Sequence, residues 1–449
     1  MRKYSLKNFK KRILNVIFWS VISAAFIGPG TITTATQAGA SYGFDLLWAF
    51  VFSTFACLLL QEASARVAIN SGMNLGQAIA TKFQNKATRQ PILLLIIGAI
   101  ILGSAAYEAG NILGSVEGLK LIFDIPQFYL VTGTGILALI SLSLRSVNTI
   151  AKFMGFIVIF MGITFITTAI FIEPPFMEVL EGSFMPHIPR DPAAGLLVLG
   201  LVGTTVVPYD LFLGSGVLDK KQTIGEMRFG ISIAIILGGI ISMAILIVGT
   251  IIEGELSFVA LGDALTQKIA PWAVPVFAFG MFAAGFSSAI TAPLAASITA
   301  KSLFEKENNN KWKTQSLYYK LVWFSILVVG LLFGYLEVEP IPAIILAQAL
   351  NGLILPFISI FLIFVINDTK LMGKNGVNGW VSNFFMAIIV WITLILGFSN
   401  ILGAVSKAAT ISNYAKFASV EIVSILSLLL SISIFVSVYK MRKRNEAII

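Results

Sequence analysis

The sequence is poor in the side chains from which most enzymes and resident metal centres are built. Its 449 residues include one cysteine, Cys57, and one histidine, His187. A single cysteine excludes a disulfide within the chain and a thiolate metal cluster, and a single histidine excludes a metal site or relay made of several histidines. A nucleophile–base pair, a metal-hydrolase motif and a nucleotide-binding loop are also missing. These absences argue against an enzyme and against a bound cofactor.

Charge is scarce as well, whereas hydrophobic residues are abundant. Charged residues make up 12% of the chain and hydrophobic residues 57%, while soluble domains carry about 25% charged residues. Apolar runs of about 20 residues, the length that crosses a bilayer as a helix, recur along the chain. The net charge of +9 lies in short loops between these runs, so it indicates membrane topology rather than nucleic-acid binding. The sequence therefore predicts an all-α polytopic protein embedded in the lipid bilayer.

Twelve membrane spans are predicted. The basic N-terminal segment MRKYSLKNFKKR precedes a long apolar segment that lacks a small-residue cleavage site, so we expect the first span to be retained. The predicted spans are residues 15–40, 45–67, 92–122, 127–144, 149–172, 193–217, 229–252, 271–300, 319–336, 341–366, 379–402 and 417–439.

The distribution of charge predicts the orientation of these spans. With the N-terminus in the cytoplasm, most of the 31 lysines and arginines fall on the cytoplasmic side, and the outer loops carry acidic residues instead. Lys and Arg are enriched in the cytoplasmic loops of membrane proteins. Both termini are therefore expected in the cytoplasm, and the placement fits a plasma membrane. Five basic residues fall on the outer side in this arrangement: Lys120, Arg190, Lys268, Lys407 and Lys416.

Two of the spans are interrupted at matching places. The first contains Gly28-Pro29-Gly30-Thr31 and the sixth contains Val206-Val207-Pro208-Tyr209-Asp210. A proline inside a membrane helix frees backbone groups that lipid cannot satisfy, and paired breaks point to the substrate site of transporters built from inverted repeats. The predicted organisation is a cytoplasmic N-terminus (1–14), a first five-helix repeat (15–172), an outer loop (173–192), a second repeat (193–366), two accessory helices (379–439) and a cytoplasmic tail (440–449).

The residues at the breaks are suited to binding a small solute. Unwinding at Gly28 exposes the carbonyl of Ala25 and its neighbours, and a half-helix that starts near Thr31 offers free amides and a positive dipole end. In the sixth span the carbonyl of Thr204 is freed, and Asp210 follows at the start of the next half-helix. The alternative for each break is a structural kink. Two matched breaks, one with an intramembrane aspartate, favour a site.

Other intramembrane polar residues are further candidates. A charged side chain at the bilayer centre costs about 2.5–3.5 kcal/mol on insertion scales. Glu108 lies mid-span and is a candidate for gating or proton relay; alternatively it is held by hydrogen bonds to Tyr107, Asn111 or a neighbouring helix. Gln348 and Asn351 share one face of the tenth span, where they line the cavity or bond to other helices.

Three remaining features are expected to be structural. Glu62 and Arg66 are four residues apart on one helix face, which predicts an ion pair near the inner surface. His187 is expected at the surface of the outer loop. Glu421 lies outside the repeats and is expected to pack or gate rather than bind substrate.

Four stretches of the chain resemble the Nramp (natural resistance-associated macrophage protein) divalent-metal transporters. GPGTITTATQAGASYGFDLLW (28–48) and GLVGTTVVPYDLFLGSG (200–216) resemble the first- and sixth-span signatures of this family. AGFSSAITAPLAAS (284–297) and LAQALNGLILPF (346–357) are similar to its eighth and tenth spans. The resemblance implies a LeuT-type fold, with two inverted five-helix repeats and two C-terminal helices, and alternating access to a midplane site between the first and sixth spans.

The family's metal-binding motifs are altered here. In place of the family's first-span motif Asp-Pro-Gly-Asn, this chain has Gly28-Pro29-Gly30-Thr31, and in place of the sixth-span motif Met-Pro-His-Asn it has Val207-Pro208-Tyr209-Asp210. In the third span, the family's glutamate corresponds to Asn111 and its nearby aspartate to Glu108. The substrate-binding positions implied are Ala25, Gly28, Thr31, Thr204, Val207, Tyr209, Asp210 and Gln348. Those implied as metal ligands are Asp210, Thr31, Gln348, Ala25 and Thr204, with Glu108 and Asn111 in gating or proton relay.

These substitutions favour hard cations. Oxygen ligands suit Mg²⁺, Ca²⁺ or Mn²⁺, and without the family's thioether no ligand discriminates in favour of softer metals. A single carboxylate is a weak cage for a dehydrated divalent ion, so retained waters are expected. Loss of the first-span aspartate and of the histidine makes proton coupling doubtful. The hypothesis is facilitated or weakly coupled transport of a divalent cation, without a cofactor and without nucleic acid, by a protein for which a monomer is a plausible state.

Two other functions stay open at this point. The same scaffold carries amino acids and other organic solutes, whose carboxylates dock on half-helix N-termini, and glycine at position 28 removes a negative charge that would repel them. A sensor or a transporter without flux is less favoured, since no cytoplasmic domain is present to transmit a signal.

Overall fold

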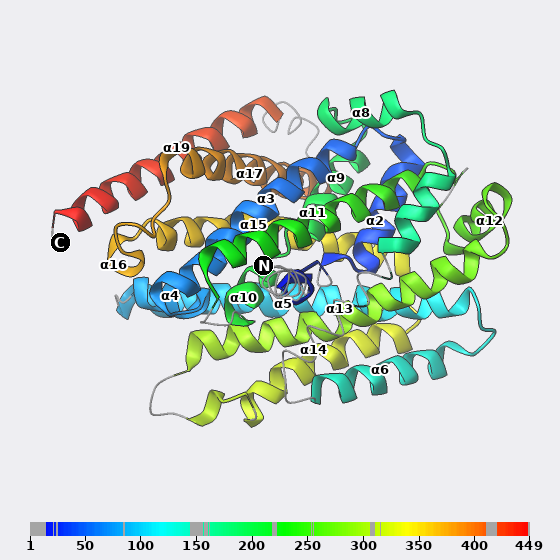
Figure 1. Ribbon diagram of the computed structural model, residues 1–449, viewed down its shortest axis with the longest axis horizontal. Coiled ribbons are helices and arrows are strands. Elements are labelled where there is room, and N and C mark those ends of the chain that lie inside the picture. Colours follow the sequence, from blue (N-terminus) through cyan, green and yellow to red (C-terminus); the bar gives the residue numbers. More distant parts are fainter. Residues whose placement is uncertain are drawn as a thin grey trace, which may run out of the picture.

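The computed structural model describes residues 15–20, 22–23, 26–83, 86–143, 156, 160, 162–217, 222–252, 254, 256–305, 310–314, 316–409 and 420–447. All regular elements in this part of the chain are helices (Figure 1). The helices with assigned bounds are α2 (Pro29–Tyr42), α3 (Leu47–Ser71), α4 (Leu75–Lys82), α5 (Lys86–Lys120), α6 (Gln127–Ser143), α8 (Phe176–Phe184), α9 (Pro192–Thr205), α10 (Pro208–Val217), α11 (Ile224–Gly249), α12 (Phe258–Lys268), α13 (Ala273–Phe304), η1 (Asn310–Trp312), α14 (Leu317–Tyr335), α15 (Pro340–Ile366), α16 (Thr369–Met372), α17 (Trp380–Ala409) and α19 (Val420–Glu446).

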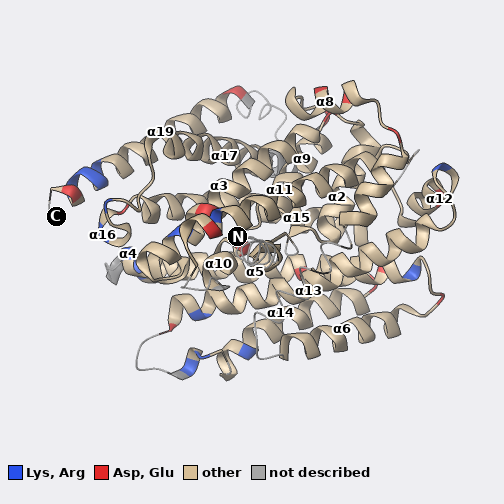
Figure 2. Cartoon of the chain, in the orientation of Figure 1, with Lys and Arg blue, Asp and Glu red and all other residues tan. Residues whose placement is uncertain are grey.

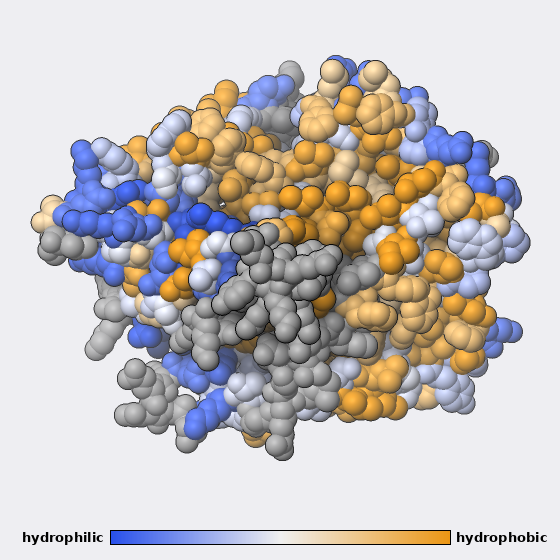
Figure 3. Space-filling model, viewed as in Figure 1, coloured by the Kyte–Doolittle hydropathy of each residue, from blue (hydrophilic) through white to orange (hydrophobic). Residues whose placement is uncertain are grey.

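The long helices confirm a polytopic membrane protein. Within the described residues, nine helical segments are long and apolar enough to cross a bilayer, with α9 and α10 counted as one, and Gln127–Ser143 and Gly162–Phe171 are shorter apolar helices. The predicted first and fifth spans lie partly outside the described residues, so the number twelve stays a prediction. The space-filling view shows apolar residues across the middle of this face and hydrophilic residues at its two ends (Figure 3).

Three short helices were not expected from the sequence. These are α4 at one end of the bundle and α8 and α12 at the other (Figure 1), and α8 lies within the segment predicted as the outer loop. Asn74 caps α4 in a capping box with Gln77, and the side chain of Ser257 caps α12, whereas α8 follows Pro175 without a side-chain cap. Helices of 8 to 11 residues are too short to span a bilayer, so a search for apolar runs passes over them.

Both predicted interruptions are present. A bend at residues 27–28 precedes α2, which begins at Pro29, where the proline lacks the amide hydrogen that a continuous helix requires. In the second half, α9 ends at Thr205 and α10 begins at Pro208, with Val206 and Val207 between them. Each half-helix thus begins at a proline in its first turn, a position that proline tolerates well.

Glycines allow the interrupted helices to pack tightly. A methyl group at Gly39 of α2 would lie 2.1 Å from the carbonyl oxygen of Leu246 in α11, and one at Gly249 would lie 2.3 Å from that of Thr36. The backbones of α2 and α11 therefore touch, as small residues permit between membrane helices. On their other sides, α2 contacts α5 and α15, α9 contacts α15, and α10 contacts α5, so the two breaks are enclosed by the bundle.

Charge is distributed unevenly between the two ends of the bundle (Figure 2). Lys and Arg are frequent near α4, α16 and the C-terminal end of α19, whereas α8 and nearby connections at the opposite end carry acidic residues. This separation supports the positive-inside argument. Orientation in a membrane and the division into two repeats with boundaries at 172 and 193 remain predictions.

Candidate functional site

Two threonine side chains join the two broken spans. The Oγ1 atoms of Thr31, at the start of α2, and Thr204, near the end of α9, lie 2.6 Å apart. The Thr31 hydroxyl also donates to the carbonyl of Phe26, which lies just before the bend. Both threonines are fully buried. The structure thus brings together two predicted positions that are 173 residues apart in the chain.

Tyr107 of α5 contacts both breaks at once. Its hydroxyl lies 3.4 Å from the carbonyl oxygen of Phe26 and 3.4 Å from Oγ1 of Thr204. Its ring packs edge-on against that of Tyr209 in α10, with 5.6 Å between the ring centroids. One buried side chain therefore touches Phe26 just before the bend, the end of α9 and the start of α10. The sequence reading considered Tyr107 only as a partner of Glu108, so this role was missed.

A second polar group surrounds Gly28. A methyl group on Gly28 would lie 2.7 Å from Oγ of Ser288 in α13 and 3.4 Å from Oδ1 of Asn111 in α5. Asn111 in turn donates through Nδ2 to Oε2 of Glu108 at 3.3 Å. The backbone at Gly28, the position of the family's aspartate, is therefore packed closely against Ser288, and Glu108 reaches this group through Asn111.

Gln348 of α15 approaches the same break from another side. A methyl group on Gly30 would lie 2.0 Å from Nε2 of Gln348, so the amide lies directly against the backbone of α2. The side-chain oxygen of Gln348 is buried and has no hydrogen-bond partner among the described residues. Asn351, one turn further along α15, is also buried but contacts Gly103 of α5.

Asp210 supplies a second buried carboxylate in this region, besides Glu108. It lies in the first turn of α10 and is 1% exposed. Neither carboxylate oxygen has a hydrogen-bond partner within the described part of the chain. The N-terminal end of a helix stabilises negative charge by its dipole and its free amides, which gives Asp210 a partial counter-charge. Burial of a carboxylate without a full partner is costly, so its presence calls for a functional explanation.

The remaining predicted positions are placed as follows. Val207 is buried in the linker between α9 and α10, and Tyr209 is buried with a hydroxyl that lacks a partner among the described residues. Ala25 lies outside the described residues. The carbonyl of Phe26 is one of the neighbours of Ala25 that the sequence pointed to, although Phe26 was not named there.

The neutral character of the site limits how it can hold a cation. The residues that the structure describes contain no cluster of three or more His, Cys, Asp or Glu side chains that could hold a metal ion. The buried carboxylates near the paired breaks are those of Asp210 and Glu108, and the other polar side chains described there offer neutral oxygens. Such a ligand set suits a hard cation that keeps part of its water shell.

Comparison with known proteins agrees with this arrangement. A sequence model of the family "Natural resistance-associated macrophage protein-like", Nramp, matches residues 20–403. The chain belongs to the Nramp family. It is 24% identical over 391 residues to the divalent metal cation transporter MntH of Klebsiella pneumoniae, covering 84% of this chain and 91% of that protein. Members of this family are transporters rather than enzymes.

Solved structures place this Nramp chain in the LeuT-type fold. A crystal structure of the Eremococcus coleocola manganese transporter matches with a TM-score of 0.73, at 17% identity, over 97% of this chain and 96% of that chain. MhsT in complex with L-phenylalanine matches with a TM-score of 0.57, at 14% identity, over 85% of this chain and 98% of that chain. At these identities the likeness concerns the fold, which confirms the predicted fold class.

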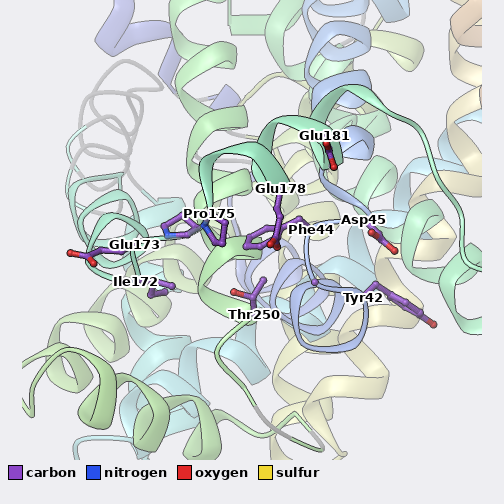
Figure 4. Close-up of a pocket in the computed structure, with 12 residues that line it drawn as sticks. Tyr42, Phe44, Asp45, Ile172, Glu173, Pro175, Glu178, Glu181 and Thr250 are labelled. Atoms are coloured by element: carbon purple, nitrogen blue, oxygen red, sulfur yellow. The ribbon is translucent and has the colours of Figure 1, made fainter.

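The Nramp chain has a separate pocket of about 530 Å³ at the far end of α2 (Figure 4). Since α2 has 14 residues, this end lies about 20 Å from the break at a rise of 1.5 Å per residue. Four of the lining residues are exposed carboxylates, which concentrate cations near a surface. These are Asp45, Glu173, Glu178 and Glu181.

The predicted ion pair is confirmed and is part of a larger network. Nε of Arg66 lies 3.0 Å from a carboxylate oxygen of Glu62, and Nη1 of Arg66 donates to the carbonyl of Gly376 at 2.6 Å. Arg228 of α11 also contacts Glu62, at 2.9 Å. His187 is exposed, as predicted, and its carbonyl accepts a hydrogen bond from the indole of Trp48. Both features lie outside the paired breaks and are structural.

Proposed function

We propose that this Nramp-family protein moves a divalent metal cation across the membrane by alternating access, with the substrate held between the two broken spans. The observation that carries the proposal is Asp210, a buried carboxylate without a hydrogen-bond partner among the described residues, at the first turn of a half-helix. Thr31, Thr204 and Gln348 add neutral oxygens around the same breaks. The names of the Klebsiella and Eremococcus relatives support a divalent metal as substrate.

We propose further that hard ions such as Mg²⁺ and Mn²⁺ are favoured. Val207 and Tyr209 replace the thioether and the imidazole that the resemblance leads one to expect, and both of those groups favour transition metals. Hydroxyl, amide and carboxylate oxygens favour harder ions. We infer that the ion keeps several waters, because one carboxylate neutralises only half of its charge.

Coupling to protons is proposed to be weak or absent. Gly28 carries no side chain at the position of the family's first-span aspartate, and Glu108 contacts Asn111 rather than a basic residue in the described chain. We place the protein in the plasma membrane with both termini in the cytoplasm, on the evidence of the charge distribution, and propose that a monomer suffices for transport.

An organic solute is the second candidate. Glycine at position 28 removes a negative charge that would repel an anionic solute, and the fold is shared with a protein solved with L-phenylalanine bound. Asp210 opposes this reading, because a substrate carboxylate near the start of α10 would be repelled.

Uptake into proteoliposomes tests the proposal. Purified protein is reconstituted and supplied with Mn²⁺, Mg²⁺ or Ca²⁺, each with and without a pH gradient. We expect saturable uptake of at least one of these ions and little effect of the gradient, because the site has neither the family's aspartate nor its histidine. Absence of flux for all three ions in folded protein, together with saturable uptake in an amino-acid panel, would transfer the function to the second candidate.

A glycine substitution tests the position of Gln348. Gly30→Ala is expected to raise the KM for the transported ion, because the new methyl group displaces the side-chain amide of Gln348. The rise should be about tenfold, which corresponds to the loss of one polar contact between the protein and the ion. The flexible side chain can move, so thermal stability should change little. The matched control is Gly195→Ala in α9, where no atom lies within 4 Å of the new methyl group. Unchanged uptake by Gly30→Ala would remove Gln348 from the site.

A further inference from the structure

The hydroxyl groups at the paired breaks form a chain whose direction is fixed by counting protons. Each hydroxyl has one proton to donate and two lone pairs to accept with. Thr31 contacts the carbonyl of Phe26, and a carbonyl oxygen only accepts, so the single proton of Thr31 goes to Phe26. The contact of 2.6 Å between Thr31 and Thr204 must then be donated by Thr204.

Tyr107 completes the chain. The proton of Thr204 is already committed to Thr31, so the contact of 3.4 Å between Tyr107 and Thr204 must be donated by Tyr107. The carbonyl of Phe26 also accepts from the amide of Gly28 at 3.0 Å. The hydroxyl of Tyr107 lies equally near the carbonyl of Phe26 and Oγ1 of Thr204, and its single proton is taken up by these two acceptors. The chain runs from Tyr107 through Thr204 and Thr31 to Phe26.

This direction has a chemical consequence for the substrate. The hydroxyl protons of Tyr107, Thr204 and Thr31 are all used in hydrogen bonds within the hydroxyl chain. None of them is therefore free to donate to a substrate carboxylate or another anion. Thr31 and Thr204 each keep one lone pair that no hydrogen bond from the described residues uses. Two hydroxyl oxygens only 2.6 Å apart thus face the breaks as acceptors, which is the property that a cation requires.

We propose that this hydroxyl chain determines the specificity of the site for a cation over an anionic solute, with the side-chain oxygens of Thr31 and Thr204 as the ligands and Tyr107 as the positioning residue that holds Thr204. The inference rests on the proposed function and deepens it. It assigns a role to the hydroxyl of Thr204, where the sequence pointed only to its carbonyl, and it brings in Tyr107, which does not itself need to touch the substrate.

The experiment measures uptake kinetics of the preferred divalent ion in proteoliposomes. Thr204→Val removes the hydroxyl and keeps the shape, and we expect the KM to rise about three- to tenfold, as for the loss of one net polar contact. Tyr107→Phe keeps the ring against Tyr209 and should raise the KM by a smaller factor with little change in maximal rate. The double variant should resemble Thr204→Val, since Tyr107 acts through Thr204 and coupled residues are not additive.

Two matched variants serve as controls. Thr205→Val alters a neighbouring buried threonine whose hydroxyl bonds to the carbonyl of Leu201 in its own helix, and Tyr319→Phe alters a buried tyrosine whose hydroxyl has no partner among the described residues. Both are expected to keep the wild-type KM. Thr204→Ser retains the hydroxyl and should restore the wild-type KM, which separates loss of the ligand from damage to packing.

The outcomes distinguish the two proposals. Wild-type protein without divalent flux would overturn the proposed function itself. Wild-type flux with Thr204→Val and Tyr107→Phe indistinguishable from the two controls would overturn the hydroxyl chain alone, as would strictly additive effects in the double variant. A raised KM restored by Thr204→Ser, with the double variant close to Thr204→Val, would support it.

Discussion

Asp210→Asn is expected to abolish divalent-cation uptake while the protein stays folded. The carboxylate is 1% exposed and lacks a hydrogen-bond partner within the described residues, so in the proposed complex the cation is its counter-charge. Removing one member of a buried charge pair costs about 3–5 kcal/mol, which corresponds to a loss of about a hundredfold or more in affinity. Asparagine keeps the size of the side chain and removes only the charge.

Stability gives this prediction a second measurement. In the absence of substrate, a buried carboxylate without a full partner destabilises the fold, so Asp210→Asn should unfold at the wild-type temperature or above it. Asp263→Asn, an exposed aspartate in α12, is the control and should change neither uptake nor stability. Undiminished uptake by Asp210→Asn would remove Asp210 from the site, and a markedly lower unfolding temperature would make it a structural residue instead.

Arg66→Ala is expected to destabilise the protein by about 3–5 kcal/mol, the usual cost of breaking a buried ion pair. The Arg66 side chain is 8% exposed and the Glu62 side chain 15%. The guanidinium also bonds to the carbonyl of Gly376 and to the side chain of Asn378, so it ties α3 to the connection between α16 and α17. Its removal leaves Glu62 with only the exposed Arg228 as an ion-pair partner among the described residues, and it leaves the carbonyl of Gly376 and the side-chain oxygen of Asn378 without their donor. The measurement is the unfolding temperature in detergent.

Arg228 supplies a control that contacts the same carboxylate. Its side chain is 57% exposed, and exposed ion pairs contribute about 0–1 kcal/mol because water screens them. Arg228→Ala should therefore change the unfolding temperature far less than Arg66→Ala. Equal effects of the two substitutions would mean that the charge on Glu62, rather than the buried hydrogen bonds of Arg66, sets the stability of this region.

The sequence by itself determined the features that depend on local chemistry. Pro29 and Pro208 cannot donate the amide hydrogen of a continuous helix, so the two breaks follow from the residue type alone, and the structure has both. Apolar runs of bilayer length fixed the class of protein. The spacing of four between Glu62 and Arg66 fixed their pairing, because such residues lie on one helix face.

Only the tertiary structure decided which groups meet at the breaks. Thr31 and Thr204 are far apart in the chain, and nothing in their local sequence indicates that their hydroxyls lie 2.6 Å apart. The same holds for Tyr107, which reaches Phe26 and Thr204 because α5 packs against both broken spans. The physical reason is that a proline or a run of apolar residues acts on its own segment, whereas hydrogen bonds between helices depend on how the whole bundle packs.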